Sequence, residues 1–226
     1  MPPPLEWAWL GRVPYREALE AQRARREAVI ARTTPPVLWL LEHDPVVTEG
    51  RRPASGGLSP EALARLGIDH VSTERGGLAT YHGPGQLVGY LICPIDDFGL
   101  TVKGTVSALE DALIAYLAQQ RLQAGRRPGY PGVWIGREKI AALGLNFRMG
   151  VSMHGFALNC TVDLAPFGYI VPCGITDGGV TSLERLLGAS APTPRDAAPA
   201  VAASVIRVLL RVPCPDPPLA RPLSVP

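Results

Sequence analysis

Two side chains in this sequence could support nucleophilic chemistry, a cysteine and a lysine. Cys173 lies between Pro172 and Gly174, a rigid and a permissive neighbour. A free thiol is only about 3% ionised at neutral pH, so a working cysteine needs a basic partner or a positive environment. Lys139 begins a predicted strand just after a hairpin turn, and desolvation can turn a lysine, unlike an arginine, into a base. Cys173 is therefore a candidate nucleophile and Lys139 a candidate base.

Each of these residues also has a simpler interpretation. Free cysteines are more often small buried hydrophobic residues, and a lysine beside a hairpin turn is more often an exposed surface residue. The chain has four histidines, but no spacing ties one of them to Cys173 in the manner of a papain-like dyad. The residue types alone leave both interpretations open.

A glycine-rich stretch from residue 74 to 92 is the strongest signal for a binding site. It holds five glycines together with Arg75, Tyr81 and His82, and it ends in an apolar segment typical of a strand. Such a backbone can approach a ligand closely, although a turn between two strands would explain the glycines equally well. A dinucleotide loop is disfavoured because Val88 stands at the third glycine position and a strand follows.

Composition excludes several classes of partner. The chain has 226 residues with a net charge of +2, from 22 basic and 20 acidic residues, and it lacks the long basic run expected for binding nucleic acid or an anionic membrane. No stretch approaches transmembrane length, and the first residues do not resemble a secretion signal. The four cysteines, which show no Cys-x-x-Cys spacing, argue against a metal site or a disulfide framework. We expect a cytoplasmic protein with reduced thiols, no metal and no cofactor.

The elements that must position these residues follow from periodicity and breakers. Amphipathic spacing predicts helices over residues 14–31, 60–66 and 195–211. A further helix is predicted to begin at a capping box, Ser107–Glu110, and to end before residues 125–132. Apolar runs predict strands over residues 37–41, 46–48, 87–92, 133–135, 139–147 and 152–162. Short turns between the last three predict an antiparallel meander. Together these elements predict one α/β domain over residues 1–226, a mixed sheet with flanking helices, and a disordered proline-rich tail at 213–226.

The last strand of the predicted meander has one unusually small face. Strand alternation places His154 on the same face as Phe156, Leu158 and Cys160, and it places Gly155, Ala157 and Asn159 on the other. A small face can accommodate a ligand or a closely packed helix, and glycine and alanine alone do not distinguish the two.

Four motifs in a fixed order resemble one known family. They are Arg75-Gly-Gly-x-x-Thr-Tyr-His-Gly-Pro-Gly-Gln-Leu87, Gly132-Val-Trp-x-x-x-x-Lys-Ile-Ala141, His154-Gly-x-Ala-Leu-Asn159 and Pro172-Cys-Gly174. Together they closely resemble the lipoyl(octanoyl) transferases of lipoate biosynthesis, also called lipoate-protein ligase B. The resemblance covers most of the chain, from residue 10 to residue 183.

The resemblance implies a fold like that of the biotin and lipoate protein ligases, and an acyl transfer without a cofactor. The cysteine matching Cys173 would take octanoate from octanoyl-acyl carrier protein as a thioester, and the lysine matching Lys139 would activate the thiol. The acceptors would be lysines of apo lipoyl domains in 2-oxoacid dehydrogenase complexes and of the glycine cleavage H protein. The substrate would contact Arg75, Gly76, Gly77, Leu78, Ala79, Thr80, Tyr81, His82, Ala142, Leu143, Gly144, His154, Gly155, Phe156 and Ala157.

Two other functions remain open at this point. A lipoate- or biotin-protein ligase would share the fold but would activate a free acid with ATP and would need no nucleophilic cysteine. A non-catalytic protein that binds carrier domains would keep the fold without turnover. Retention of both Cys173 and Lys139 argues against this second alternative.

Overall fold

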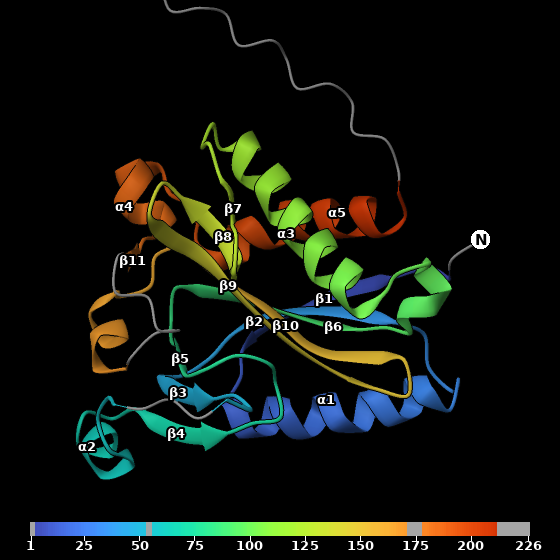
Figure 1. The fold of residues 1–226 in the computed structure, drawn as a ribbon, viewed down its shortest axis with the longest axis horizontal. Coiled ribbons are helices and arrows are strands. Elements are labelled where there is room, and N and C mark those ends of the chain that lie inside the picture. Colours follow the sequence, from blue (N-terminus) through green and yellow to red (C-terminus); the bar gives the residue numbers. More distant parts are fainter. Residues whose placement is uncertain (1–2, 53–55, 171–177, 212–226) are drawn as a thin grey trace, which may run out of the picture.

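A large mixed sheet organises the chain (Figure 1). The structure, a computed structural model, describes residues 3–52, 56–170 and 178–211. The strands follow the order β1-β2-β6-β10-β9-β8-β7, and β11 pairs with β9. Their bounds are β1 Glu6–Arg12, β2 Val37–Glu42, β6 Gln86–Ile92, β7 Gly125–Arg127, β8 Tyr130–Ile135, β9 Glu138–Arg148, β10 Val151–Asn159 and β11 Gly179–Val180. Only the β1–β2 and β9–β11 pairs are parallel among these strands.

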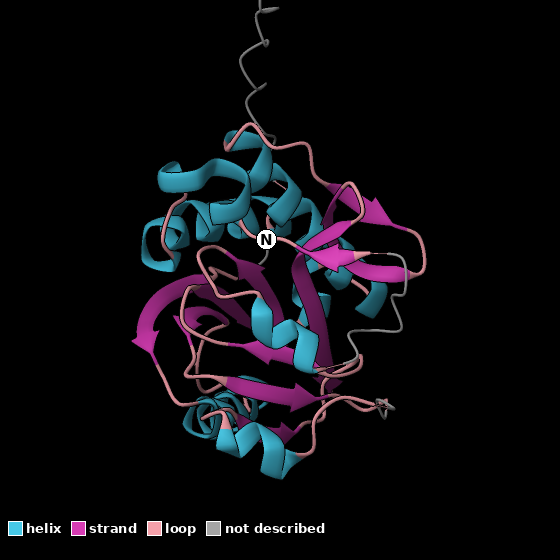
Figure 2. Cartoon of the chain, turned by 90° about the vertical axis from the view of Figure 1, so that its left-hand side faces the viewer, coloured by secondary structure: helices cyan, strands magenta, loops and turns pink. Residues whose placement is uncertain are grey.

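Helices cover both faces of the large sheet. The helices α3 (Val102–Gln119) and α5 (Pro194–Leu209) pack together on one face, and α1 (Tyr15–Ile30) crosses the other (Figures 1 and 2). A smaller sheet of β4 (Asp69–Ser72), β3 (Val46–Glu49) and β5 (Thr80–His82) lies on the α1 side together with α2 (Pro60–Arg65). The short helix α4 (Leu183–Leu187) precedes α5. The mixed sheet with flanking helices confirms the predicted α/β fold class. None of the helices in the described ranges is both long and apolar enough to cross a membrane.

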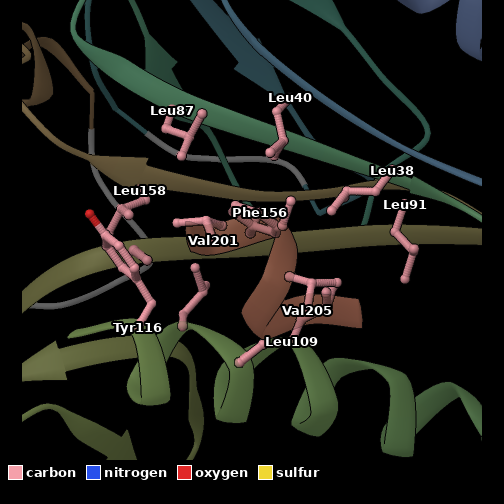
Figure 3. Close-up of a cluster of buried hydrophobic side chains, with 14 of the residues drawn as sticks. Leu38, Leu40, Leu87, Leu91, Leu109, Tyr116, Phe156, Leu158, Val201 and Val205 are labelled. Carbon is pink, nitrogen blue, oxygen red and sulfur yellow. The ribbon is translucent and has the colours of Figure 1, made fainter. Parts of the chain in front are cut away.

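The main hydrophobic core lies between the large sheet and the α3–α5 pair. Figure 3 shows leucines of β2 and β6 facing Leu109 and Tyr116 of α3 and Val201 and Val205 of α5. One face of α3, formed by Leu109, Leu113, Tyr116 and Leu117, is fully buried, as the spacing i, i+4, i+7, i+8 requires when one face meets a sheet. This core covers one face of the large sheet. The opposite face of the sheet lies toward α1 and the smaller sheet.

The predicted start of α3 is wrong. The helix begins five residues before Ser107, at Val102, because the side chain of Thr101 caps it by accepting a hydrogen bond from the Gly104 amide at 3.0 Å. Glu110, expected to close a capping box, is buried in the helix and accepts hydrogen bonds from the Gly132 amide at 2.9 Å and Arg126 Nε at 2.7 Å. Its carboxylate therefore ties α3 to the strand that follows.

The predicted antiparallel meander is confirmed as β8, β9 and β10. Residues 125–132, expected only to end the helix, instead contain the strand β7 and the beginning of β8. The strand β1 was not predicted either, since its residues are mostly exposed and lack an apolar alternation. The predicted tail at 213–226, together with Cys173 and Cys214, lies outside the described residues.

The side chain of His154 in β10 lies on the face opposite to the one that strand alternation predicts. His154 has a φ of 62°, a left-handed conformation that interrupts the alternation of the strand. Its ring lies 6.2 Å from that of Tyr90, which packs with Ala157 on the α1 side of the sheet. The prediction that His154 shares a face with Phe156 is therefore wrong, because Phe156 belongs to the core on the α3 side.

Candidate active site

The hairpin of β8 and β9 fixes the position of Lys139. A register shift in this hairpin pairs Lys139 with Trp134, and Nζ of the lysine lies 4.9 Å from the centre of the tryptophan ring. Nζ of Lys139 donates a hydrogen bond to the Pro131 carbonyl at 3.0 Å, and the residue is 9% exposed. A β-carbon on Gly132 would come within 3.1 Å of the lysine side chain and 2.7 Å of the Ala141 carbonyl. The glycine of the motif therefore makes room for the buried lysine.

Small residues form a floor that extends away from Lys139. In the β9–β10 ladder, Ala142 pairs with Ala157 and Gly144 pairs with Gly155, and paired residues share a face. A β-carbon on Gly155 would meet the carbonyl oxygen of Gly89 at 2.2 Å, so no larger residue fits there. All four of these small residues line one cavity, so the small face of the predicted strand borders open space.

The glycine-rich segment forms a roof above this floor. Arg75 is 7% exposed and donates hydrogen bonds to the Thr48 carbonyl at 2.6 Å and to Oγ1 of Thr48 at 2.8 Å. The amide of Gly76 donates to the Leu145 carbonyl at 2.9 Å. These contacts hold the segment over β9 and bring its backbone close to the floor.

A cavity of about 500 Å³ lies between roof and floor. It is lined by Lys139 and by all of the predicted contact residues except Tyr81. The ring of Tyr81 instead packs edge-on against Phe167 at 5.5 Å, in a separate apolar cluster. A second cavity of about 260 Å³ shares Ala79, Thr80, Lys139 and Ala142 with the first. The amine of the lysine therefore lies where the two cavities meet.

A buried chain of hydrogen bonds explains the polar residues of two motifs. Nδ1 of His82 donates to Oε1 of Gln86 at 2.7 Å, and the Gln86 amide nitrogen donates to Oδ1 of Asn159 at 2.9 Å. The Asn159 amide nitrogen donates to the Thr181 carbonyl at 2.9 Å, and the Thr181 amide donates to the Lys139 carbonyl at 3.0 Å. Burial lowers the pKa of His82 to about 3, so its imidazole is neutral. This chain links the roof to the backbone of the catalytic candidate.

Sequence reasoning missed two tyrosines that line the larger cavity, Tyr15 and Tyr90. The hydroxyl of Tyr90 donates to Nε2 of His43 at 2.6 Å, because Nδ1 of that histidine donates to the Val13 carbonyl at 2.7 Å. Burial raises the pKa of Tyr15 to about 12. The alternation of β6 places Tyr90 on the same face as Val88, and only the pairing of β6 with β10 brings that face to the cavity.

Comparison with known proteins identifies the family. The sequence model of one protein family, the lipoyl protein ligase A/B catalytic domain, matches residues 14–206 of this chain. An octanoyltransferase of Alkaliphilus metalliredigens is 46% identical over 79% of this chain and 84% of its own length. An octanoyltransferase of Clavibacter sepedonicus is 45% identical over 87% of this chain and 86% of its own length. The chain belongs to the octanoyltransferase family. It is therefore an acyltransferase, as the resemblance implied.

Solved structures confirm the predicted likeness of fold. A lipoate-protein ligase A bound with ATP superposes with a TM-score of 0.70 over 92% of this chain and 86% of its own, at 16% identity. The biotin protein ligase of Aquifex aeolicus superposes with a TM-score of 0.54 over 91% of this chain and 69% of its own, at 10% identity. At such identities the likeness concerns the fold alone.

The two cysteines that the structure of this octanoyltransferase describes are poor candidates for the nucleophile. Cys93 and Cys160 are fully buried, and burial raises the pKa of each thiol to about 12. A thiol with such a pKa is a poor nucleophile at neutral pH. Within the described ranges, no group of three or more His, Cys, Asp or Glu side chains is arranged to hold a metal ion. The candidate nucleophile Cys173 lies outside the described residues.

Proposed function

We propose that this octanoyltransferase moves an octanoyl group from octanoyl-acyl carrier protein to a lysine of apo lipoyl domains, through a thioester on Cys173. The catalytic unit is a single domain over residues 1–226, and the acceptors are the lipoyl domains of 2-oxoacid dehydrogenase complexes and the glycine cleavage H protein. The observation that carries the proposal is the buried amine of Lys139 at the junction of two cavities. Both acyl transfers must occur at one such place.

In the first transfer, Lys139 takes the proton of the Cys173 thiol, and the thiolate attacks the thioester carbonyl of the donor. The new carbon–sulfur bond forms as the bond to the donor sulfur breaks, and the departing thiolate receives the proton from the lysine. In the second transfer, the acceptor amine attacks the acyl-cysteine, and the carbon–nitrogen bond forms as the bond to Cys173 breaks. The proton released by the amine returns to the Cys173 sulfur through Lys139, which restores the enzyme.

The floor of the larger cavity supplies the binding energy for the acyl chain. Burying about six methylenes at about 0.8 kcal/mol each contributes on the order of 5 kcal/mol. The alanine and glycine pairs of β9 and β10 leave room for such a chain, and the segment from Arg75 to Thr80 covers it. Exclusion of water from this site protects the thioester until the acceptor arrives.

Intact mass spectrometry tests the proposal directly. Protein mixed with octanoyl-acyl carrier protein in the absence of ATP should gain one octanoyl group, which peptide mapping should locate on Cys173. Addition of an apo lipoyl domain should discharge that group onto the acceptor lysine. If the protein were instead an ATP-dependent ligase, like the lipoate-protein ligase A that shares this fold, labelling would require ATP and free octanoate. Labelling under those conditions alone would overturn the proposal.

A further inference from the structure

The end of the larger cavity that lies away from Lys139 carries three polar side chains beside the apolar Leu145 and Phe147. Along β9 and β10, the pairs Ala142–Ala157, Gly144–Gly155 and Leu145–His154 follow one another from the lysine outward. Tyr90 pairs with Gly155 across β6 and β10, and the ring of Tyr15, from α1, stacks on that of His82 at 5.9 Å. Tyr15, Tyr90 and His154 all line the cavity, and we call these three residues the polar end wall.

His154 is the least satisfied member of the polar end wall. The residue is 2% exposed, and neither of its ring nitrogens has a hydrogen-bond partner within the part of the chain that the structure describes. Burial lowers its pKa to about 3, so the neutral ring presents one donor and one acceptor. The side-chain nitrogen of Gln22, whose oxygen accepts from the His154 amide at 3.0 Å, is also without a partner among the described residues.

The conformation of His154 is itself unfavourable. A non-glycine residue at a φ of 62° in the middle of a strand is strained, and such residues cluster at functional sites. The strain turns the imidazole to the cavity face of the sheet, where it meets the ring of Tyr90 at 6.2 Å. An alternating strand would have placed this side chain in the α3 core, as it does Phe156.

We infer that the polar end wall of Tyr15, Tyr90 and His154 sets the upper limit of acyl-chain length in this enzyme. This inference rests on the proposed function, because it assumes that the acyl chain lies along the floor from Lys139. An apolar chain end that reaches the wall must leave the buried imidazole nitrogens of His154 without partners, which is unfavourable. A chain that stops short of the wall leaves room for water to satisfy them.

The dimensions agree with a limit longer than eight carbons and shorter than sixteen. The Leu145–His154 pair lies six residues from Lys139 along β9, or about 20 Å at about 3.3 Å per residue. An extended octanoyl chain spans about 9 Å and an extended tetradecanoyl chain about 17 Å, from ordinary carbon–carbon bond lengths. The octanoyl end therefore lies over the alanine and glycine floor, and the tetradecanoyl end contacts the wall.

The wild-type enzyme allows a test without any substitution. The rate constant for acylation of Cys173 is measured by mass spectrometry with octanoyl, tetradecanoyl and 14-hydroxytetradecanoyl thioesters of acyl carrier protein. If the wall is polar toward the chain end, the hydroxyl-terminated chain should load about tenfold faster than the methyl-terminated chain of equal length, because the hydroxyl gives a buried group its partner. If the methyl-terminated chain loads equally fast or faster, the inference is overturned.

Two substitutions test the same idea from the protein side. Tyr15→Phe removes one hydroxyl without changing the volume of the wall, and His154→Gly removes the ring at a backbone conformation that glycine adopts without strain. Each should raise the ratio of the tetradecanoyl to the octanoyl acylation rate about tenfold. Each methylene of the chain that becomes buried against an apolar wall increases the acylation rate about fourfold. Tyr116→Phe is the control for removal of a buried tyrosine hydroxyl, because Tyr116 lies in the core between α3 and the large sheet and does not line the cavity.

The outcomes separate this inference from the proposed function. If octanoyl loads onto Cys173 but neither variant changes the rate ratio by more than twofold, the inference fails and the proposed function stands. The same holds if Tyr116→Phe changes the ratio as much as Tyr15→Phe does. If wild-type protein takes up no octanoyl group from the carrier protein, the proposed function fails first.

Discussion

Replacing Ala142 by leucine tests whether the floor of the larger cavity holds the acyl chain. Ala142 lies three residues from Lys139 along β9, lines the larger cavity and pairs with Ala157 across the ladder, so three additional carbons would project onto the floor under the outer half of an octanoyl chain. Displacing the outer half of an octanoyl chain removes about four methylenes at about 0.8 kcal/mol each. The loss of about 3 kcal/mol corresponds to about a 200-fold decrease in kcat/KM for the octanoyl donor.

The assay compares donors that differ only in chain length. The rate of acylation of Cys173 is measured with octanoyl and butanoyl thioesters of acyl carrier protein. Ala142→Leu should reduce the octanoyl rate about 200-fold but the butanoyl rate only a few-fold, because the short chain does not extend past the obstruction. Ala118→Leu, on the exposed surface of α3, is the control for a general effect. Equal losses for the two chains, or no loss for octanoyl, would refute an acyl chain lying on this floor.

Three further predictions concern the catalytic residues and the pH dependence of stability. Cys173→Ser should abolish octanoyl transfer in a folded protein. Cys160→Ser should remain active, but its free energy of unfolding should be lower by about 1–2 kcal/mol because the substitution places a hydroxyl in the core. Transfer assays and urea unfolding of the two variants check these expectations. Lys139→Arg should be nearly inactive, because arginine cannot release its proton near neutral pH, and a retained rate would leave Lys139 only an electrostatic role. Burial lowers the pKa values of His43, His82 and His154 to between about 3 and 4, so unfolding takes up protons below pH 6.5. The free energy of unfolding should therefore fall as pH decreases from about 6.5 to 4. A free energy of unfolding that stays constant from pH 7 to 5 in urea titrations would contradict this.

Sequence by itself determined the elements whose signal is local. The periodicity of apolar residues was sufficient for α1, α5, the strands β2 and β6 and the β8–β10 meander, because 3.6- and 2-residue repeats reflect one buried face. The ordered motifs also predicted that Lys139 and the glycine-rich roof belong to the site. Both line the cavity, since a buried lysine and a close backbone approach each require a particular residue type beside them.

Only the tertiary structure decided how these elements meet. Tyr15 and Tyr90 are 75 positions apart in the sequence, and their place in the cavity depends on the antiparallel pairing of β6 with β10 and on the helix that crosses it. The left-handed backbone of His154 moved its ring to the opposite face, and no alternation pattern contains that information. Local patterns report which side chains are buried, whereas strand order and backbone strain are set by contacts between distant segments. The lysine and the roof were therefore predictable, but the polar end of the cavity was not.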